Sequence, residues 1–115
     1  MTIRIFHNPR CSKSRATLAL LQEREIEPEI TLYLETPPTA DELRSILDKL
    51  GLSARELIRK GEAEFGEQGL SDMSLSEDQL IAAMVAAPRL IERPIVLAND
   101  RAAIGRPPES VLDIL

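Results

Sequence analysis

Residues 2–25, "TIRIFHNPRCSKSRATLALLQERE", decide the fold because they predict a strand, a loop and a helix in direct succession. The segment 2–6 alternates apolar with polar residues and contains β-branched side chains, which is typical of a strand. From Ser12 onward, Leu18, Ala19 and Leu21 recur at helical spacing. Cys11, the only cysteine of the chain, therefore lies where the loop after the strand meets the helix.

Downstream of this unit, residues 29–34 ("EITLYL") predict a second strand, and two prolines at 37 and 38 separate it from the next segment. Residues 39–88 predict a mainly helical block. Its helix starts carry a hydroxyl residue followed three positions later by Glu or Gln, the signature of a capping box. The three pairs are Thr39 with Glu42, Ser53 with Glu56, and Ser76 with Gln79, and Gly51 and Pro88 are placed to end helices.

The C-terminal segments "RPIVLAND" (93–100) and "RAAIGR" (101–106) predict an antiparallel hairpin. They meet at Asn99 and Asp100, two residue types that tolerate the positive φ of a tight turn. The last segment, "PPESVLDIL" (107–115), predicts a helix whose apolar face is Val111, Leu112 and Leu115.

The order of these elements predicts the fold class. A strand, a helix and a strand in succession form a parallel pair, and the late hairpin must join the same sheet. We therefore expect an α/β fold with a thioredoxin-like mixed sheet of about four strands and a helical insertion at approximately 39–88, between the second and third strands. A chain of 115 residues suits a single domain spanning 1–115.

Composition excludes several function classes. The 14 Lys and Arg against 19 Asp and Glu give a net charge of −5, the wrong sign for binding nucleic acid through its phosphates. No apolar run approaches the roughly 20 residues that span a bilayer, and the N-terminal run is too short for a secretory signal. We therefore expect a soluble, cytoplasmic protein with no nucleic-acid or membrane partner. One cysteine and one histidine form neither an internal disulfide nor a zinc site.

The surroundings of Cys11 favour a reactive thiol. A thiolate is stabilised by the N–H groups and dipole at a helix N-terminus, and Arg10, Lys13 and Arg15 add positive charge close by in sequence. The alternative is a small core residue, the commoner role of a lone cysteine. The stretch "NPRCSKSR" offers almost no apolar neighbours for such a role, so we interpret Cys11 as a nucleophile.

Three polar residues near Cys11 have two interpretations each. His7 stabilises the thiolate by charge or hydrogen bonding, or else binds loop backbone. Ser12 and Ser14 offer hydroxyl and backbone donors to an anion, or else are solvated first-turn serines. Ser14 occupies the position at which a Cys-x-x-Cys motif carries its second cysteine, so an oxidised Cys11 requires an outside thiol such as glutathione or a glutaredoxin.

With these motifs identified, the chain resembles the ArsC-type arsenate reductases, a glutaredoxin-coupled family with a thioredoxin-like fold, in its short form. The resemblance is carried by "FHNPRCSKSR", "YLETPPTADELRSIL", "LGLSARELIRK", "LIERPIVLAND" and "IGRPPESVLDIL". It implies that Cys11 attacks arsenate, that His7 keeps the thiol ionised, and that Pro94 is the cis-proline beside the cysteine. The arginines of the anion site would be Arg59, Arg93 and Arg106.

Planar guanidinium groups suit an oxyanion better than ammonium groups do, which supports these three arginines independently. Each also has a structural alternative: Arg59 complements a helix dipole, and Arg93 and Arg106 are loop charges before prolines. The resemblance implies reduction of arsenate to arsenite through a thiol-arsenate adduct on Cys11, with glutathione as co-substrate, glutaredoxin as partner, and no metal or bound cofactor.

Two alternatives remain. One is a glutathione- or glutaredoxin-linked thiol oxidoreductase that acts on another substrate. The other is a regulatory protein similar to the Spx-type relatives of this fold, which bind RNA polymerase. Those relatives carry Cys-x-x-Cys, so Ser14 counts against the second alternative.

Overall fold

The computed structural model describes residues 2–115, which form two compact units. The first comprises the described residues up to Thr36 together with Arg93–Leu115, and the second is Pro37–Glu92. The assignment of the whole chain to a single domain stays a prediction. No helix among residues 2–115 combines the length and apolar character needed to cross a membrane.

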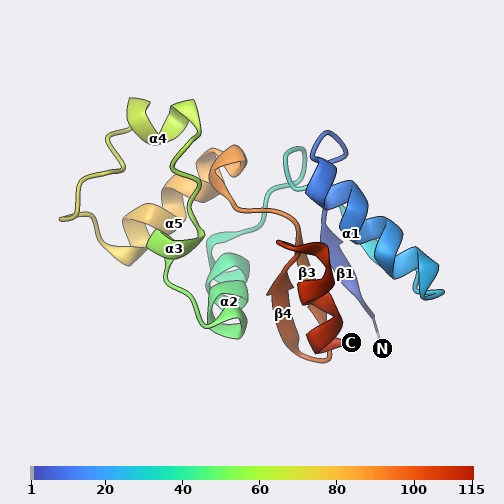
Figure 1. The fold of residues 1–115 in the computed structure, drawn as a ribbon. Coiled ribbons are helices and arrows are strands. Elements are labelled where there is room, and N and C mark those ends of the chain that lie inside the picture. The colour runs from blue at the N-terminus through green and yellow to red at the C-terminus, as the bar shows by residue number, and fades with distance from the viewer. Residues whose placement is uncertain (1) are drawn as a thin grey trace. The chain divides into compact units, whose positions relative to one another are not determined.

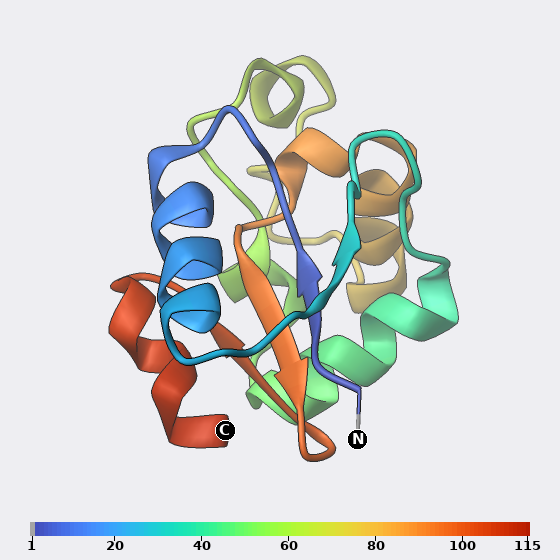
Figure 2. The same cartoon turned by 90° about the vertical axis from the view of Figure 1, so that its right-hand side faces the viewer.

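The first unit contains a four-stranded sheet in the order β2-β1-β3-β4 (Figures 1 and 2). Its strands are β1 (Arg4–Phe6), β2 (Glu29–Thr31), β3 (Ile95–Ala98) and β4 (Arg101–Ile104). The pair β1 and β2 is parallel and is connected through helix α1 (Ser12–Glu23), whereas β3 is antiparallel to both β1 and β4. The prediction of a mixed, thioredoxin-like sheet is confirmed.

One face of this sheet carries the core of the unit. Ile5 of β1 lies opposite Val96 of β3 in the register, and both are fully buried. Leu21 of α1 packs against them together with Val111 of the C-terminal 3-10 helix η2 (Pro108–Ile114). Figure 2 shows α1 and η2 side by side on this face. The helix that begins at Cys11 is therefore fixed to the sheet by buried aliphatic side chains.

The hairpin between β3 and β4 turns at Asn99 and Asp100, as predicted. Both residues have positive φ, 54° and 60°, which the short polar side chains tolerate. The Asn99 side chain also donates a hydrogen bond of 2.7 Å to the carbonyl of Ile114, so the turn is connected to η2.

Two element predictions need correction. The second strand ends at Thr31 rather than at residue 34, because the N–H groups of Glu35 and Thr36 both donate to the carbonyl of Leu32 and turn the chain out of the sheet. The last helix is a 3-10 helix, with three residues per turn. Its buried face is therefore Val111 and Ile114, three positions apart, and Leu115 is exposed.

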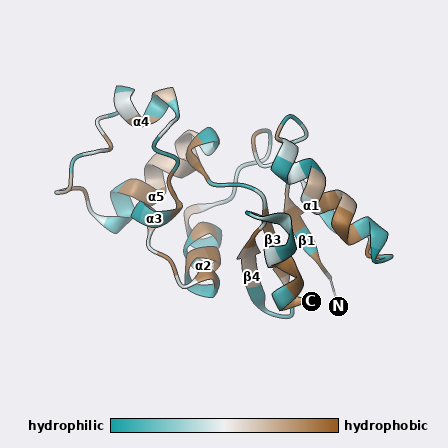
Figure 3. Cartoon of the chain, viewed as in Figure 1, coloured by the Kyte–Doolittle hydropathy of each residue, from teal (hydrophilic) through white to brown (hydrophobic). Residues whose placement is uncertain are grey.

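The helical face of α1 also differs from the prediction. Leu21 is buried, but Ala19 is exposed, and the other buried residues of the helix are Ser14 and Thr17. Side chains that carry a hydroxyl group therefore line the part of this face nearest to Cys11. At the opposite end of the helix, Figure 3 shows that the C-terminal residues of α1 are hydrophilic.

The second unit is mainly helical, and the predicted caps are present. Thr39, Ser53 and Ser76 accept hydrogen bonds from the N–H groups of Glu42, Glu56 and Gln79, and Gly51 ends the second helix at φ 69°. Its elements are α2 (Ala40–Leu50), α3 (Ala54–Leu57), α4 (Ala63–Glu67), α5 (Glu77–Ala86) and η1 (Pro88–Leu90). Helix α5 contacts α2, α3 and η1 and has a buried aliphatic face that includes Leu80, Ile81 and Met84.

Candidate active site

Cys11 is the N-cap residue of α1 and follows the loop after β1 directly. Asn8 shapes this loop: its side-chain oxygen accepts a hydrogen bond from the N–H of Arg10 and its carbonyl accepts one from the N–H of Cys11, both at 3.0 Å. The Cys11 carbonyl in turn begins the helix by accepting from the N–H of Arg15. The cysteine is buried, with 7% of its surface exposed, so its sulfur lies in a defined place rather than on a free loop.

The thiol of Cys11 has a lowered pKa. Burial alone would raise it. The N–H of Ser14, the positive charge of Arg93, the N–H of Lys13 and a hydrogen bond from Arg93 act against burial, and together they outweigh it. The thiolate fraction at neutral pH is therefore larger than that of an ordinary cysteine, which is what a nucleophile requires.

A second guanidinium lies beside the same sulfur. Arg106 follows β4, and its Nη2 is 3.9 Å from the Cys11 Sγ. Its Nε donates a 2.9 Å hydrogen bond to the carbonyl of Arg93, which fixes the direction of the planar group. Arg93 and Arg106, 13 residues apart in the chain, are thus brought together at Cys11 by the β3–β4 hairpin.

The positive charge at the sulfur therefore comes from a different source than the sequence neighbours suggested. Arg10, Lys13 and Arg15 are all exposed, and Arg15 directs its Nη1 to the carbonyl of Pro9 at 2.9 Å. The charge of Arg15 acts on His7, whose pKa it lowers. Arg93, which is distant in sequence, thus supplies the charge that lowers the pKa of the thiol.

His7 forms a hydrogen bond with a side chain in the first turn of α1, and its effect on the Cys11 thiol stays a prediction. Burial, followed by the charge of Arg15, lowers the pKa of His7, so the imidazole is neutral at pH 7. Its Nδ1 shares a 2.6 Å hydrogen bond with the hydroxyl of Ser14, and the imidazole tautomer decides which group donates. The same hydroxyl accepts a 3.0 Å hydrogen bond from the N–H of Asn8.

The two serines of the first turn differ in role. Ser12 is exposed, as expected of a solvated first-turn serine, and its part in anion binding stays a prediction. Ser14 is fully buried, so its interpretation as a solvated serine is wrong. Its hydroxyl is occupied by His7 and Asn8, and only its backbone N–H serves the sulfur.

Pro94 follows a cis peptide bond with Arg93, as the resemblance implied. The bond between Arg106 and Pro107 is also cis, and no pattern in the sequence predicted it. Both arginines that act on Cys11 therefore immediately precede a cis-proline.

Arg59 belongs to the helical unit, where its guanidinium forms an ion pair of 2.5 Å with Glu62 and a longer one of 3.9 Å with Glu92. It lies two residues beyond the end of α3. Its role at the anion site stays a prediction.

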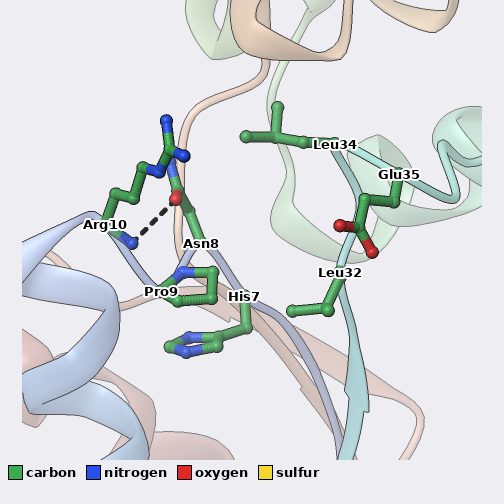
Figure 4. Close-up of a pocket in the computed structure, with 7 residues that line it drawn as sticks. All are labelled: His7, Asn8, Pro9, Arg10, Leu32, Leu34 and Glu35. Atoms are coloured by element: carbon green, nitrogen blue, oxygen red, sulfur yellow. Dashed lines mark hydrogen bonds between the residues drawn. The ribbon is translucent and has the colours of Figure 1, made fainter.

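A pocket of about 220 Å³ borders the loop that precedes Cys11 (Figure 4). Leu32 and Leu34 form one wall and Asn8 and Pro9 the other, and Arg10 and Glu35 bring one charge of each sign to its lining. Cys11 itself does not line it. Across residues 2–115, no three His, Cys, Asp or Glu side chains are grouped as a metal site would require.

Comparisons with known proteins cover nearly the whole chain. The model of the ArsC family matches residues 6–114. The chain is 60% identical to the uncharacterized protein YfgD of Escherichia coli K12, over 98% of this chain and 96% of that protein. It is 53% identical to an arsenate reductase of Neisseria meningitidis, over 98% of this chain and 97% of the relative.

Among solved structures, the arsenate reductase from Vibrio cholerae superposes with a TM-score of 0.97 at 51% identity, covering 100% of this chain and 98% of the other. The superposition covers all four strands, and the family model also includes α1 and the segments of both arginines. The chain belongs to the ArsC family.

Proposed function

We propose that this protein reduces arsenate to arsenite, with Cys11 as the nucleophile. The observation that carries the proposal is a thiol of lowered pKa at the start of α1 with the guanidinium of Arg106 at 3.9 Å. A site that holds a sulfur anion beside two arginines also suits a second anion that must approach that sulfur. Relatives named arsenate reductase support arsenate as that anion.

Arsenate binding is assigned first to Arg93 and Arg106. Their guanidinium planes present several N–H donors, so they can bind two oxygens of an oxyanion while neutralising its charge. We assign Arg59 as a third anion ligand, and the exposed N–H and hydroxyl of Ser12 and the charge of Arg15 as outer contributors. The Ser14 hydroxyl is fully buried and already hydrogen-bonded to His7 and Asn8, so we rank it below these groups as an anion ligand.

The chemistry begins when the Cys11 thiolate attacks arsenic. A sulfur–arsenic bond forms, one arsenic–oxygen bond breaks, and that oxygen leaves as water after it takes up protons. Glutathione then attacks arsenic, forming a second sulfur–arsenic bond while another oxygen leaves as water. The glutaredoxin thiol attacks the glutathione sulfur and forms a mixed disulfide with it, and the electron pair of the broken bond stays on arsenic, which becomes arsenic(III). Water then replaces Cys11 on arsenic, so that arsenite is released and the Cys11 thiolate is regenerated.

The test is NADPH oxidation coupled through glutathione reductase, with purified protein, glutathione and glutaredoxin, in the presence and absence of arsenate. Cys11→Ser serves as the blank because it removes the nucleophile and retains the shape of the residue. We expect arsenate-dependent oxidation that Cys11→Ser abolishes. Omission of glutaredoxin should slow turnover if it supplies the second equivalent.

Arginine variants separate anion binding from general charge effects. Arg93→Ala, Arg106→Ala and Arg59→Ala should each raise the KM for arsenate. Arg24→Ala is the matched control, because Arg24 lies at the opposite end of α1 from Cys11. Equal kinetics in all four variants would disprove the assigned anion site.

An absence of arsenate-dependent turnover, with Cys11 still unusually reactive toward alkylating agents, would instead support a thiol oxidoreductase with another substrate. Retention of RNA polymerase on the immobilised protein would support the regulatory alternative.

A further inference from the structure

We infer that Gly105 is a positioning residue that sets the distance between Cys11 and Arg106 by allowing α1 to pack directly against the segment around Pro94. The inference concerns the thiol and its arginine alone, so it goes beyond the proposed function and holds for any substrate. Gly105 follows β4 and immediately precedes Arg106.

Gly105 occupies a point where three segments meet. It is buried, and its N–H donates a 2.9 Å hydrogen bond to the carbonyl of Pro94. A Cβ atom at this position would lie 2.4 Å from Oγ1 of Thr17, 3.1 Å from Cγ2 of Thr17 and 2.8 Å from Cγ of Pro94. The first and third distances are shorter than any ordinary carbon contact, so no side chain fits unless a neighbour moves.

Gly105 differs from the other glycines in the space available for a side chain. The structure describes all 5 glycines of the chain, and a Cβ at any of the other four would meet no atom within 4 Å. Gly51 and Gly69 have positive φ, which accounts for glycine at those turns. At Gly105 the requirement is the close approach itself.

Neither Thr17 nor Pro94 can move aside without a loss of stabilising interactions. Thr17 is fully buried and β-branched, and its hydroxyl donates a 2.8 Å hydrogen bond to the carbonyl of Lys13 one helical turn earlier. Pro94 is held by its ring and by the bond from Gly105. A side chain at 105 would therefore push α1 away from the segments that carry Arg93 and Arg106.

Such a movement changes the distance between the Cys11 sulfur and Arg106, because the contact joins the helix that Cys11 caps to the residue next to Arg106. Thr17 and Cys11 belong to the same helix and its cap, six positions apart, and Arg106 is the next residue after Gly105. The Nη2 of Arg106 lies 3.9 Å from the Sγ of Cys11, where the interaction energy changes steeply with distance. Relieving the 2.4 Å contact requires a shift of about 1 Å.

The experiment measures the rate of Cys11 alkylation by iodoacetamide against pH in Gly105→Ala. A retreat of about 1 Å by the guanidinium should slow alkylation at neutral pH by about 1.5- to 4-fold and move the midpoint toward that of a free cysteine. Gly66→Ala is the matched control: a Cβ there meets nothing and the backbone is helical, so its profile should equal that of the wild type.

A compensating variant distinguishes positioning from stability. Thr17→Ala removes both Thr17 atoms that meet the new Cβ, so Gly105→Ala/Thr17→Ala should return part of the way to the wild-type profile. The remaining shift reflects the Pro94 contact at 2.8 Å. A merely structural role would lower the melting temperature of Gly105→Ala without moving the alkylation midpoint.

Two results would overturn the inference. One is a folded Gly105→Ala with the wild-type alkylation profile. The other applies if Gly105→Ala does not fold: the double variant is then compared with Thr17→Ala alone, and identical profiles would show that Gly105 does not set the environment of the thiol. Neither readout uses arsenate, so failure here is separate from failure of the proposed reaction.

Discussion

Ser14→Ala tests whether the buried hydroxyl in the first turn of α1 supports the site. The substitution removes two hydrogen bonds, one shared with Nδ1 of His7 at 2.6 Å and one from the N–H of Asn8 at 3.0 Å. It leaves the backbone N–H of residue 14 in place, so the direct effect of that group on the Cys11 sulfur is retained.

The loss of stability depends on how deeply the two groups that lose their hydrogen bonds are buried. These groups are Nδ1 of His7 and the N–H of Asn8. His7 is buried, so an unsatisfied Nδ1 costs about 1–3 kcal/mol. Asn8 is only half-buried, and water can replace part of its lost bond, so about 1 kcal/mol is added. Alanine is the better helix former and returns about 0.5 kcal/mol. The free energy of unfolding should therefore fall by about 1.5–3.5 kcal/mol.

Urea unfolding followed by far-ultraviolet circular dichroism measures this change, provided that the slope with urea stays the same. Ser12→Ala is the matched control, because Ser12 is exposed in the same turn, and it should change the free energy by less than about 0.5 kcal/mol. Equal stability of the two variants would refute the reasoning. So would a Ser14→Ala variant as stable as the wild type.

Three further outcomes are expected. Because the pKa of folded His7 lies below that of the unfolded chain, the unfolded state takes up the proton first as pH falls through about 6.5, and stability should decrease by up to about 1.4 kcal/mol per pH unit. Urea titrations of the wild type and His7→Gln should show this slope only in the wild type. Arg106→Gln removes a charge 3.9 Å from the sulfur, worth about 1 kcal/mol in water-like surroundings and more at the lower effective dielectric of a part-buried contact, so iodoacetamide alkylation at neutral pH should slow by at least about fivefold, while Arg24→Gln leaves it unchanged. Ser76→Ala removes the cap that accepts from the N–H of Gln79 and should lower the unfolding free energy by about 1 kcal/mol; an unchanged urea midpoint would contradict the assigned cap.

Local signals in the sequence predicted much of the fold. The turn at Asn99 and Asp100 and the hydroxyl caps at Ser53 and Ser76 depend on the chemistry of a few adjacent residues, and the structure confirms each. The position of Cys11 at the start of a helix depends in the same way on the strand and helix patterns around it.

Features that depend on distant contacts could not be predicted in this way. Ser14 is polar and lies in a first turn, which suits a solvated side chain, but its burial depends on His7 and Asn8 lying across the loop. The charge acting on Cys11 comes from Arg93 and Arg106, which only the hairpin brings near. The family resemblance pointed to these arginines. Their spacing in the sequence alone did not favour them over Arg10, Lys13 or Arg15 as the source of positive charge at Cys11.

The N-cap of α1 also couples the chemical state of the sulfur to the stability of the fold. Thr39, Ser53 and Ser76 cap their helices with a hydroxyl oxygen, whereas in α1 the sulfur of Cys11 holds that position, and the N–H groups of Lys13 and Ser14 in the first turn lower its pKa. A thiolate is the form of that side chain that best complements the helix end. Alkylation or protonation of Cys11 should therefore weaken the helix as well as block the chemistry, so the melting temperature becomes a direct report on the state of the sulfur.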